Sequence, residues 1–142
     1  MSTIKDLSKA DKYHTLVEKH SISKNHQFYK EIDNLCFFAK NVYNCGNYLI
    51  RQDYFKTLKE TSKKPASFLT YNEIQKQLQN SGSVDYYNLP TKVSQSILRH
   101  VTYNWKAHFA ASKDYLKNPE KYTGTPRIPN YLHKTEGRFD LS

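Results

Sequence analysis

The fold of this chain is limited first by a stripe of apolar residues that recurs at helical spacing after Pro90. A step of four residues advances slightly more than one 3.6-residue turn, so residues spaced in this way form one slanted stripe on a helix. The stripe comprises Val93, Ile97, Val101, Trp105 and Phe109, with Leu116 further on. Pro90 suits a first turn, where its missing N–H is not needed. Gly124, Pro126 and Pro129 predict that the helix has ended and that an extended segment follows.

A row of basic residues is predicted on a different face of the same helix. Lys92, Arg99, Lys106 and Lys113 follow one another at intervals of seven. Residues 89–142 hold nine basic and four acidic residues, and so carry five of the nine net positive charges of the chain. A basic helix face beside a basic extended segment is suited to follow a phosphate backbone, which is recognised by shape and charge. The alternative is a solvated helix face that has no ligand.

The composition favours a polyanionic partner, nucleic acid before membrane. The net charge is +9, and twelve Tyr are among the 14% of residues that are aromatic. Tyr beside Lys and Arg suits base stacking over a charged backbone. Most of these Tyr are nevertheless expected to be half-buried packing residues with a solvated hydroxyl. Trp105, on the apolar stripe, is expected in the core rather than against a base.

No targeting, membrane or metal-binding pattern is present in the sequence. No apolar run approaches the eighteen residues of a membrane span, and the N-terminus lacks a signal-peptide core. Cys36 and Cys45, the only cysteines, form no C-x-x-C pair. We therefore expect no zinc site, no other cofactor, and a cytoplasmic protein in a reducing environment.

A second long helix is predicted from about His26 to about Leu58. A heptad seam is formed by residues alternately three and four apart, namely Ile32, Leu35, Ala39, Val42, Gly46 and Leu49. Gly46 on this seam predicts the close approach of another helix, with a backbone contact to nucleic acid as the rarer alternative. The seam can pair within the chain or with another chain. The second possibility defines the alternative function, a small helical protein-interaction module that forms a homo- or hetero-oligomer.

Two shorter elements are predicted elsewhere in the chain. Residues 13–22 alternate in the manner of a strand, and a strand must pair with another, so the segment after Gly124 is its expected partner. Thr70, with Glu73 three residues later, forms the sequence of a capping box and predicts a short helix that ends near Asn80.

Several motifs in this order resemble the N-terminal region of TnpB/OrfB-type transposases, insertion-sequence proteins that act as compact RNA-guided DNA nucleases. A helix that opens L-P-[ST]-x-V-x-Q and is followed by G-x-P-[KR]-[FI] is similar to theirs, and the matching residues here are Leu89, Pro90, Thr91, Val93, Gln95, Phe109, Gly124, Pro126, Arg127 and Ile128. The V-Y-N of residues 42–44, followed by Leu49 and Arg51, and the L-T-Y of residues 69–71 add to the resemblance.

The resemblance implies a mainly α fold with a few β-strands. A helical recognition lobe of three helices would be inserted between strands of a partial wedge-type β-barrel. The expected divisions are a disordered tail over residues 1–12, a first wedge strand over 13–24, the helical lobe over 25–124 and a truncated returning wedge segment over 125–142.

The resemblance also implies that the chain binds DNA and structured guide RNA. Family nucleases hold their catalytic metal ions on three acidic residues and carry an inserted zinc ribbon with paired C-x-x-C motifs. Neither has a counterpart here, so we expect no nuclease activity, no catalytic residue and no metal. The chain would be a fragment, a truncated copy or a stand-alone module. It would lie in the bacterial cytoplasm, associated with the nucleoid when bound, and would compete or interact with a full-length transposase.

Ten residues are expected to contact nucleic acid. Arg99, Lys106 and Arg127 are assigned to the phosphate backbone. Thr70, Tyr71 and Gln75 match family positions near the flanking-motif DNA, where Gln can form two hydrogen bonds with adenine. For Thr70 and Tyr71 the alternative is a helix cap and a packing residue. The remaining expected contacts are Arg51, Lys92, Tyr131 and Lys134.

Overall fold

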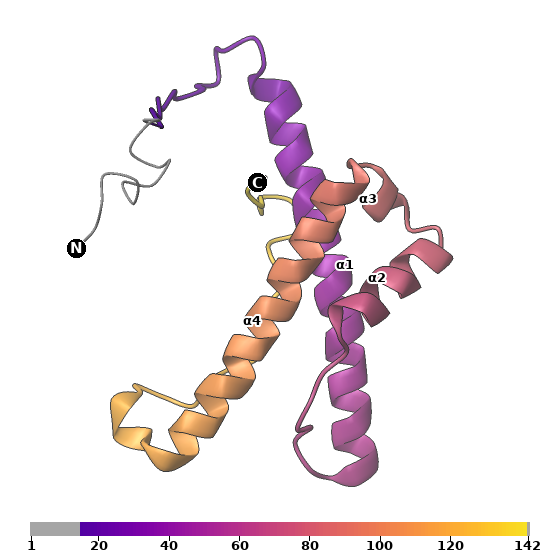
Figure 1. The fold of residues 1–142 in the computed structure, drawn as a ribbon, viewed down its shortest axis with the longest axis vertical. Coiled ribbons are helices and arrows are strands. Elements are labelled where there is room, and N and C mark those ends of the chain that lie inside the picture. Colours follow the sequence, from indigo (N-terminus) through magenta and orange to yellow (C-terminus); the bar gives the residue numbers. More distant parts are fainter. Residues whose placement is uncertain (1–14, 142) are drawn as a thin grey trace, which may run out of the picture.

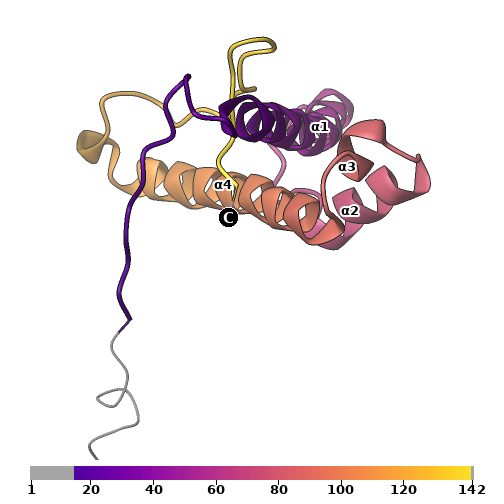
Figure 2. The same cartoon turned by 90° about the horizontal axis from the view of Figure 1, so that it is seen from above.

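The described part of the chain, residues 15–141 of a computed structural model, is built from helices (Figure 1). The elements are α1 (Tyr29–Thr61), α2 (Tyr71–Asn80), the single-turn α3 (Val84–Tyr87), α4 (Thr91–Lys117) and the 3₁₀ turn η3 (Pro119–Lys121). Helices α1 and α4 cross each other, and α2 and α3 lie together at one side of the crossing (Figures 1 and 2). After η3 the chain returns to α1.

Gly46 allows the two long helices to cross closely. A Cβ at this position would lie 2.7 Å from Cδ2 of Leu98 and 3.4 Å from Cγ2 of Val101, both on α4. The prediction that Gly46 admits a neighbouring helix is therefore confirmed. The crossing buries the central part of the α1 seam, from Ala39 to Gly46, and the central part of the α4 stripe, from Ile97 to Trp105. Ile32, the first residue of the predicted seam, is 37% exposed.

The core lies around this crossing. Trp105 and Val101 are fully buried on α4, and Val42 and Ile50 are fully buried on α1. The prediction that Trp105 belongs to the core is confirmed. Leu116, the last member of the predicted stripe, is 83% exposed because it lies beyond the crossing, near the end of α4.

Helix α2 begins at the predicted capping box. The Thr70 hydroxyl accepts a hydrogen bond from the Glu73 N–H, and the Glu73 carboxylate accepts one from the Thr70 N–H. The long helices have different limits from those expected. Helix α1 begins at Tyr29 rather than at His26, and α4 ends at Lys117, where Asn118 leaves the helical conformation directly before Pro119.

The expected β-structure is wrong: residues 15–141 contain no strand and therefore no part of a barrel. In the first expected strand, Leu16 and Val17 are 92% and 81% exposed. A strand needs a neighbouring backbone to bond with, and no segment within residues 15–141 pairs with these residues in this way. The start of that segment at Tyr13 and the expected disordered tail of residues 1–12 lie outside the described residues.

The segment expected to return as a second strand instead lies along α1, and we call residues 122–141 the tail. The side-chain amide of Asn44 donates to the Leu132 carbonyl at 3.0 Å and accepts from the Leu132 N–H at 2.9 Å. One side chain thus supplies the donor and the acceptor that a neighbouring strand would supply. Side chains of α1 likewise bond the tail carbonyls of Pro129, Asn130 and Lys134, so backbone groups of the tail are satisfied without a sheet.

The end of the tail is fastened at both long helices. The Arg138 guanidinium pairs with the Asp33 carboxylate on α1, at 2.8 Å between Nε and Oδ1. The Phe139 ring stacks on Tyr43 of α1 at 5.1 Å and meets the His100 ring of α4 edge-on at 5.7 Å. Figure 2 shows the tail looping over α1 on the side away from α4 before its end turns toward α4.

Candidate nucleic-acid interface

A cleft of about 510 Å³ opens between α4 and the segment that leads into α2. Its lining comes from two stretches of chain, residues 66–71 and the α4 residues from 99 to 109. The lining residues are Ala66, Ser67, Phe68, Thr70, Tyr71, Arg99, Thr102, Tyr103, Lys106 and Phe109. Four of the ten residues expected to contact nucleic acid meet here, namely Thr70, Tyr71, Arg99 and Lys106.

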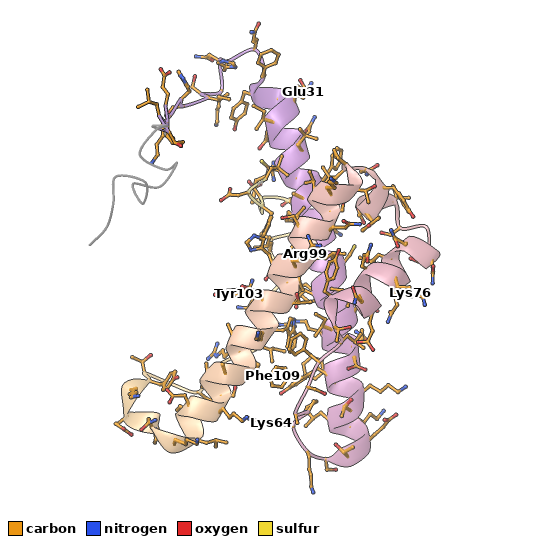
Figure 3. The ribbon with its side chains drawn as sticks, in the orientation of Figure 1. Glu31, Lys64, Lys76, Arg99, Tyr103 and Phe109 are labelled. Carbon is orange, nitrogen blue, oxygen red and sulfur yellow. The ribbon has the colours of Figure 1, made fainter. Side chains whose placement is uncertain are left out.

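The interior of the cleft is aromatic. Phe68 stacks on Phe109 with ring centres 5.5 Å apart and planes 12° from parallel, and this contact fixes the connecting segment against α4. Tyr103 is 69% exposed and also borders the cleft. In Figure 3, Arg99, Tyr103 and Phe109 follow one another along α4. The site therefore presents aromatic rings to a ligand that comes from solvent.

The charged groups around the cleft are cationic. The Arg99 guanidinium lies over the Tyr71 ring, 4.8 Å from its centre, and Lys106 is exposed. Burial raises the pKa of the Tyr71 hydroxyl, and the charge of Arg99 opposes this shift. No acidic residue lines the cleft among the described residues. Aromatic surface beside two cations without a carboxylate suits an aromatic anion.

A second hollow of about 380 Å³ adjoins the first along α4. Ser96, Arg99, His100 and Tyr103 line it. Arg99 and Tyr103 border both hollows, so each can contact ligands on either side. Tyr103 thus stands between two recesses rather than at the edge of one.

Thr70 and Gln75 are less available to a ligand in the cleft than expected. The Thr70 hydroxyl also donates to the Glu73 carboxylate at 3.0 Å, so this side chain is engaged as the helix cap although it borders the cleft. Gln75 is half-buried on α2 and does not line the cleft. Of the three expected flanking-motif residues, only Tyr71 contacts a basic residue of the cleft, through its ring against Arg99.

The basic row of α4 is exposed along its whole length, as its four members Lys92, Arg99, Lys106 and Lys113 are all solvent-accessible. Consecutive members are about 10.5 Å apart along the helix axis. The two central members line the cleft, and the two outer members extend the positive charge beyond it in both directions.

The remaining expected contacts lie at the tail. The Arg51 Nε–H donates to the Pro129 carbonyl at 3.0 Å, and the guanidinium lies 4.6 Å from the ring centre of Tyr131. These two predicted ligand contacts are thus partners of each other. Lys134 is exposed, and its carbonyl accepts a hydrogen bond from the Lys40 ammonium. The structure does not bring these three residues into the cleft.

Arg127 borders another hollow, of about 390 Å³, under the tail. His108 shares this hollow, and its Nδ1 atom is buried without a hydrogen-bond partner. Burial lowers the pKa of His108, a hydrogen bond with the Arg127 backbone raises it, and the charge of Lys64 lowers it. The net effect lowers the pKa and so favours the neutral imidazole beside the tail.

The sequence interpretation missed Tyr103 and Phe68. Tyr103 lies four residues after Arg99 and three before Lys106, so it necessarily shares their helix face. This spacing is a signal in the sequence that would have identified it. Phe68 has no comparable signal, because it comes from an irregular segment whose course depends on its stack with Phe109.

The part of the chain that the structure describes has neither a candidate metal site nor a helix suited to cross a membrane. Residues 15–141 contain no group of three His, Cys, Asp or Glu side chains placed to hold a metal ion. None of their helices is both long and apolar enough to cross a membrane. Comparisons with protein families, curated proteins and solved structures find no match to this chain.

Proposed function

We propose that this chain binds nucleic acid through the cleft and the basic row of α4. The observation that carries the proposal is the meeting of exposed aromatic and cationic groups on one helix face, with Arg99, Tyr103 and Lys106 within two turns. Bases supply aromatic faces, phosphates supply negative charge, and the two alternate along a strand. The positive charge that continues to Lys92 and Lys113 supports a ligand longer than the cleft.

We further propose DNA and structured guide RNA as the ligands, in the manner of TnpB/OrfB-type transposases. The support is the order of the sequence motifs. In such a system base pairing reads the sequence, while the protein holds the backbone. The chain would contribute binding without nuclease activity, and an interaction with a full-length transposase belongs to the same proposal.

The alternative, a protein-interaction module that pairs through the α1 seam, has less support. Ala39, Val42 and Gly46 are buried within the chain, and Gly46 lies directly against α4. A seam that is already covered offers little surface to a second chain. Sedimentation at low and high salt separates the two functions, since the alternative requires an oligomer that persists in high salt.

The test of nucleic-acid binding is fluorescence anisotropy with a structured RNA and a duplex DNA over a series of salt concentrations. A variant in which Lys92, Arg99, Lys106 and Lys113 are all replaced by Gln should bind weakly. Its slope of log affinity against log salt should fall by about 0.7 to 0.9 for each phosphate contact that is lost.

The matched control replaces four exposed lysines outside this face by Gln, at Lys19, Lys24, Lys56 and Lys59. Both variants lose the same net charge, so a general effect of charge would weaken them equally. The proposal requires a much larger loss from the α4 variant. Equal losses, or no binding by the unmodified chain at low salt, would count against it.

A further inference from the structure

The shape of the cleft points to a particular state of the nucleic acid. A recess of about 510 Å³ has the size of a site for a small molecule rather than that of a broad surface for a helix. Bases inside a duplex are stacked above and below and present only their edges to a protein. An aromatic recess can hold a base by its face only when that base has left the stack.

The second hollow strengthens this reading of the site. Tyr103 borders a recess on each side and is 69% exposed, so its ring is accessible to a ligand. Arg99 borders both recesses and is oriented by its contact with Tyr71, 4.8 Å from the ring centre. Because Arg99 and Tyr103 border the same two recesses, a nucleotide whose base stacks at Tyr103 can place its phosphate within reach of the guanidinium.

We propose that the cleft binds an unpaired nucleotide, with its base stacked at Tyr103 and its phosphate at Arg99 and Lys106. This inference rests on the proposed function and specifies the ligand of the same site. The nucleotide is expected to be unpaired before binding, as in a bulge, a loop or a single strand. Extruding a base from a Watson–Crick pair costs at least as much free energy as one stacking contact returns.

The test compares two labelled RNA stems of the same sequence, one fully paired and one with a single-nucleotide bulge. By anisotropy at one salt concentration, the unmodified chain should bind the bulged stem about tenfold more tightly, a difference within the range that base–aromatic stacking supplies. The same pair of stems in DNA should give the same preference, because the base face is what the cleft recognises. A preference confined to one sugar would contradict this.

Tyr103→Ala is the decisive variant. It should abolish the preference, so that the bulged stem binds no more tightly than the paired stem. Tyr103→Phe, which keeps the ring, should retain the preference. The side chain is mostly exposed, so its truncation leaves the core intact, and a thermal melt verifies this.

Matched controls come from the same molecule. Tyr87→Ala removes another exposed tyrosine, 56% accessible, from α3 and should keep the preference. Lys106→Gln should reduce the preference, whereas Lys113→Gln, in the same row but outside the cleft, should not.

The binding results distinguish a failure of the unpaired-nucleotide site from a failure of nucleic-acid binding as a whole. Equal binding of both stems by the unmodified chain, or a preference that survives Tyr103→Ala, overturns the unpaired-nucleotide site and leaves nucleic-acid binding intact. Binding of neither stem overturns both.

Discussion

Asn47 connects three parts of the molecule through one buried amide. Its Oδ1 atom accepts a hydrogen bond from the Trp105 indole N–H at 2.8 Å. Its Nδ2 atom donates to the carbonyls of Pro129 and Asn130, each at 3.2 Å. The side chain is fully buried, so these bonds are protected from water. One polar residue thus joins α1, α4 and the tail at the centre of the fold.

Asn47→Leu should destabilise the fold, because Leu is similar in size but leaves the Trp105 N–H and the Asn130 carbonyl without this partner. The Pro129 carbonyl keeps its hydrogen bond from Arg51. Each buried polar group left unsatisfied costs about 1 to 3 kcal/mol. Urea denaturation followed by circular dichroism measures the loss. Asn34→Leu, an exposed position on the same helix, is the control and should change stability little. Similar midpoints for the two variants would contradict the role of Asn47.

His108 should make stability depend on pH. Its pKa in the folded chain lies below the ordinary value of 6.5, mainly because of burial. Below pH 6.5 the unfolded chain binds a proton that folded His108 does not bind, so the free energy of unfolding should fall until the folded pKa is reached. Above that window the neutral form predominates in both states and the contribution of this residue is constant.

Urea midpoints of the unmodified chain and of His108→Gln, measured at about pH 7.5 and about pH 5.5, on either side of the histidine pKa, isolate this residue from the other histidines. The unmodified chain should lose more stability on acidification than the variant. An equal decline in both proteins would assign the pH dependence to other groups.

At the scale of elements, the crossing of α1 and α4 depends on the absence of a side chain at Gly46. Gly46→Val should destabilise the fold, because a Cβ alone would already lie 2.7 Å from the buried Leu98 side chain. Overpacking of a core costs about 1 to 3 kcal/mol. The gain in helix propensity from Gly to Val is smaller, at about 0.4 kcal/mol, so the net effect is a loss.

Gly124→Val is the matched control for this substitution, since a Cβ at Gly124 would meet no atom within 4 Å. Thermal or urea unfolding should show a clear loss for the Gly46 variant and little change for the control. A Gly46→Val protein as stable as the unmodified chain would mean that the helices can separate without cost.

The helices could be predicted from the sequence because their signals are local. The stripe from Val93 to Phe109 and the capping box at Thr70 depend only on spacing along the chain. The course of the tail could not be predicted in this way. It depends on Lys40, Asn44, Asn47 and Arg51, polar residues spaced along α1 whose role becomes visible only when the tail lies beside them.

The candidate site was predictable to the same extent. Arg99 and Lys106 follow from a regular spacing on one helix, and the structure brings them together at the cleft. Arg51 and Tyr131 are basic and aromatic in the same way but contact each other from distant parts of the sequence, a pairing that no local pattern encodes. Composition identifies residues suited to a ligand, whereas the fold decides which of them remain available.

At the scale of the whole molecule, the two sides of the α1–α4 pair differ in what they offer. The tail occupies one side of α1 and engages its polar groups within the chain (Figure 2). The cleft and the basic row lie along α4, with Arg99 and Tyr103 accessible (Figure 3). This division predicts that nucleic acid meets the α4 face and leaves the tail docked.

An NMR titration of the ¹⁵N-labelled chain with a bulged RNA stem tests that claim most directly, because it reports on every backbone amide at once. The expected result is that chemical-shift changes concentrate at residues 66–71 and along α4 from Arg99 to Phe109, with little change from Pro129 to Phe139. Chemical-shift changes centred on the tail and Tyr131 would contradict the account. So would the absence of any change at an RNA concentration that saturates binding in the anisotropy titration.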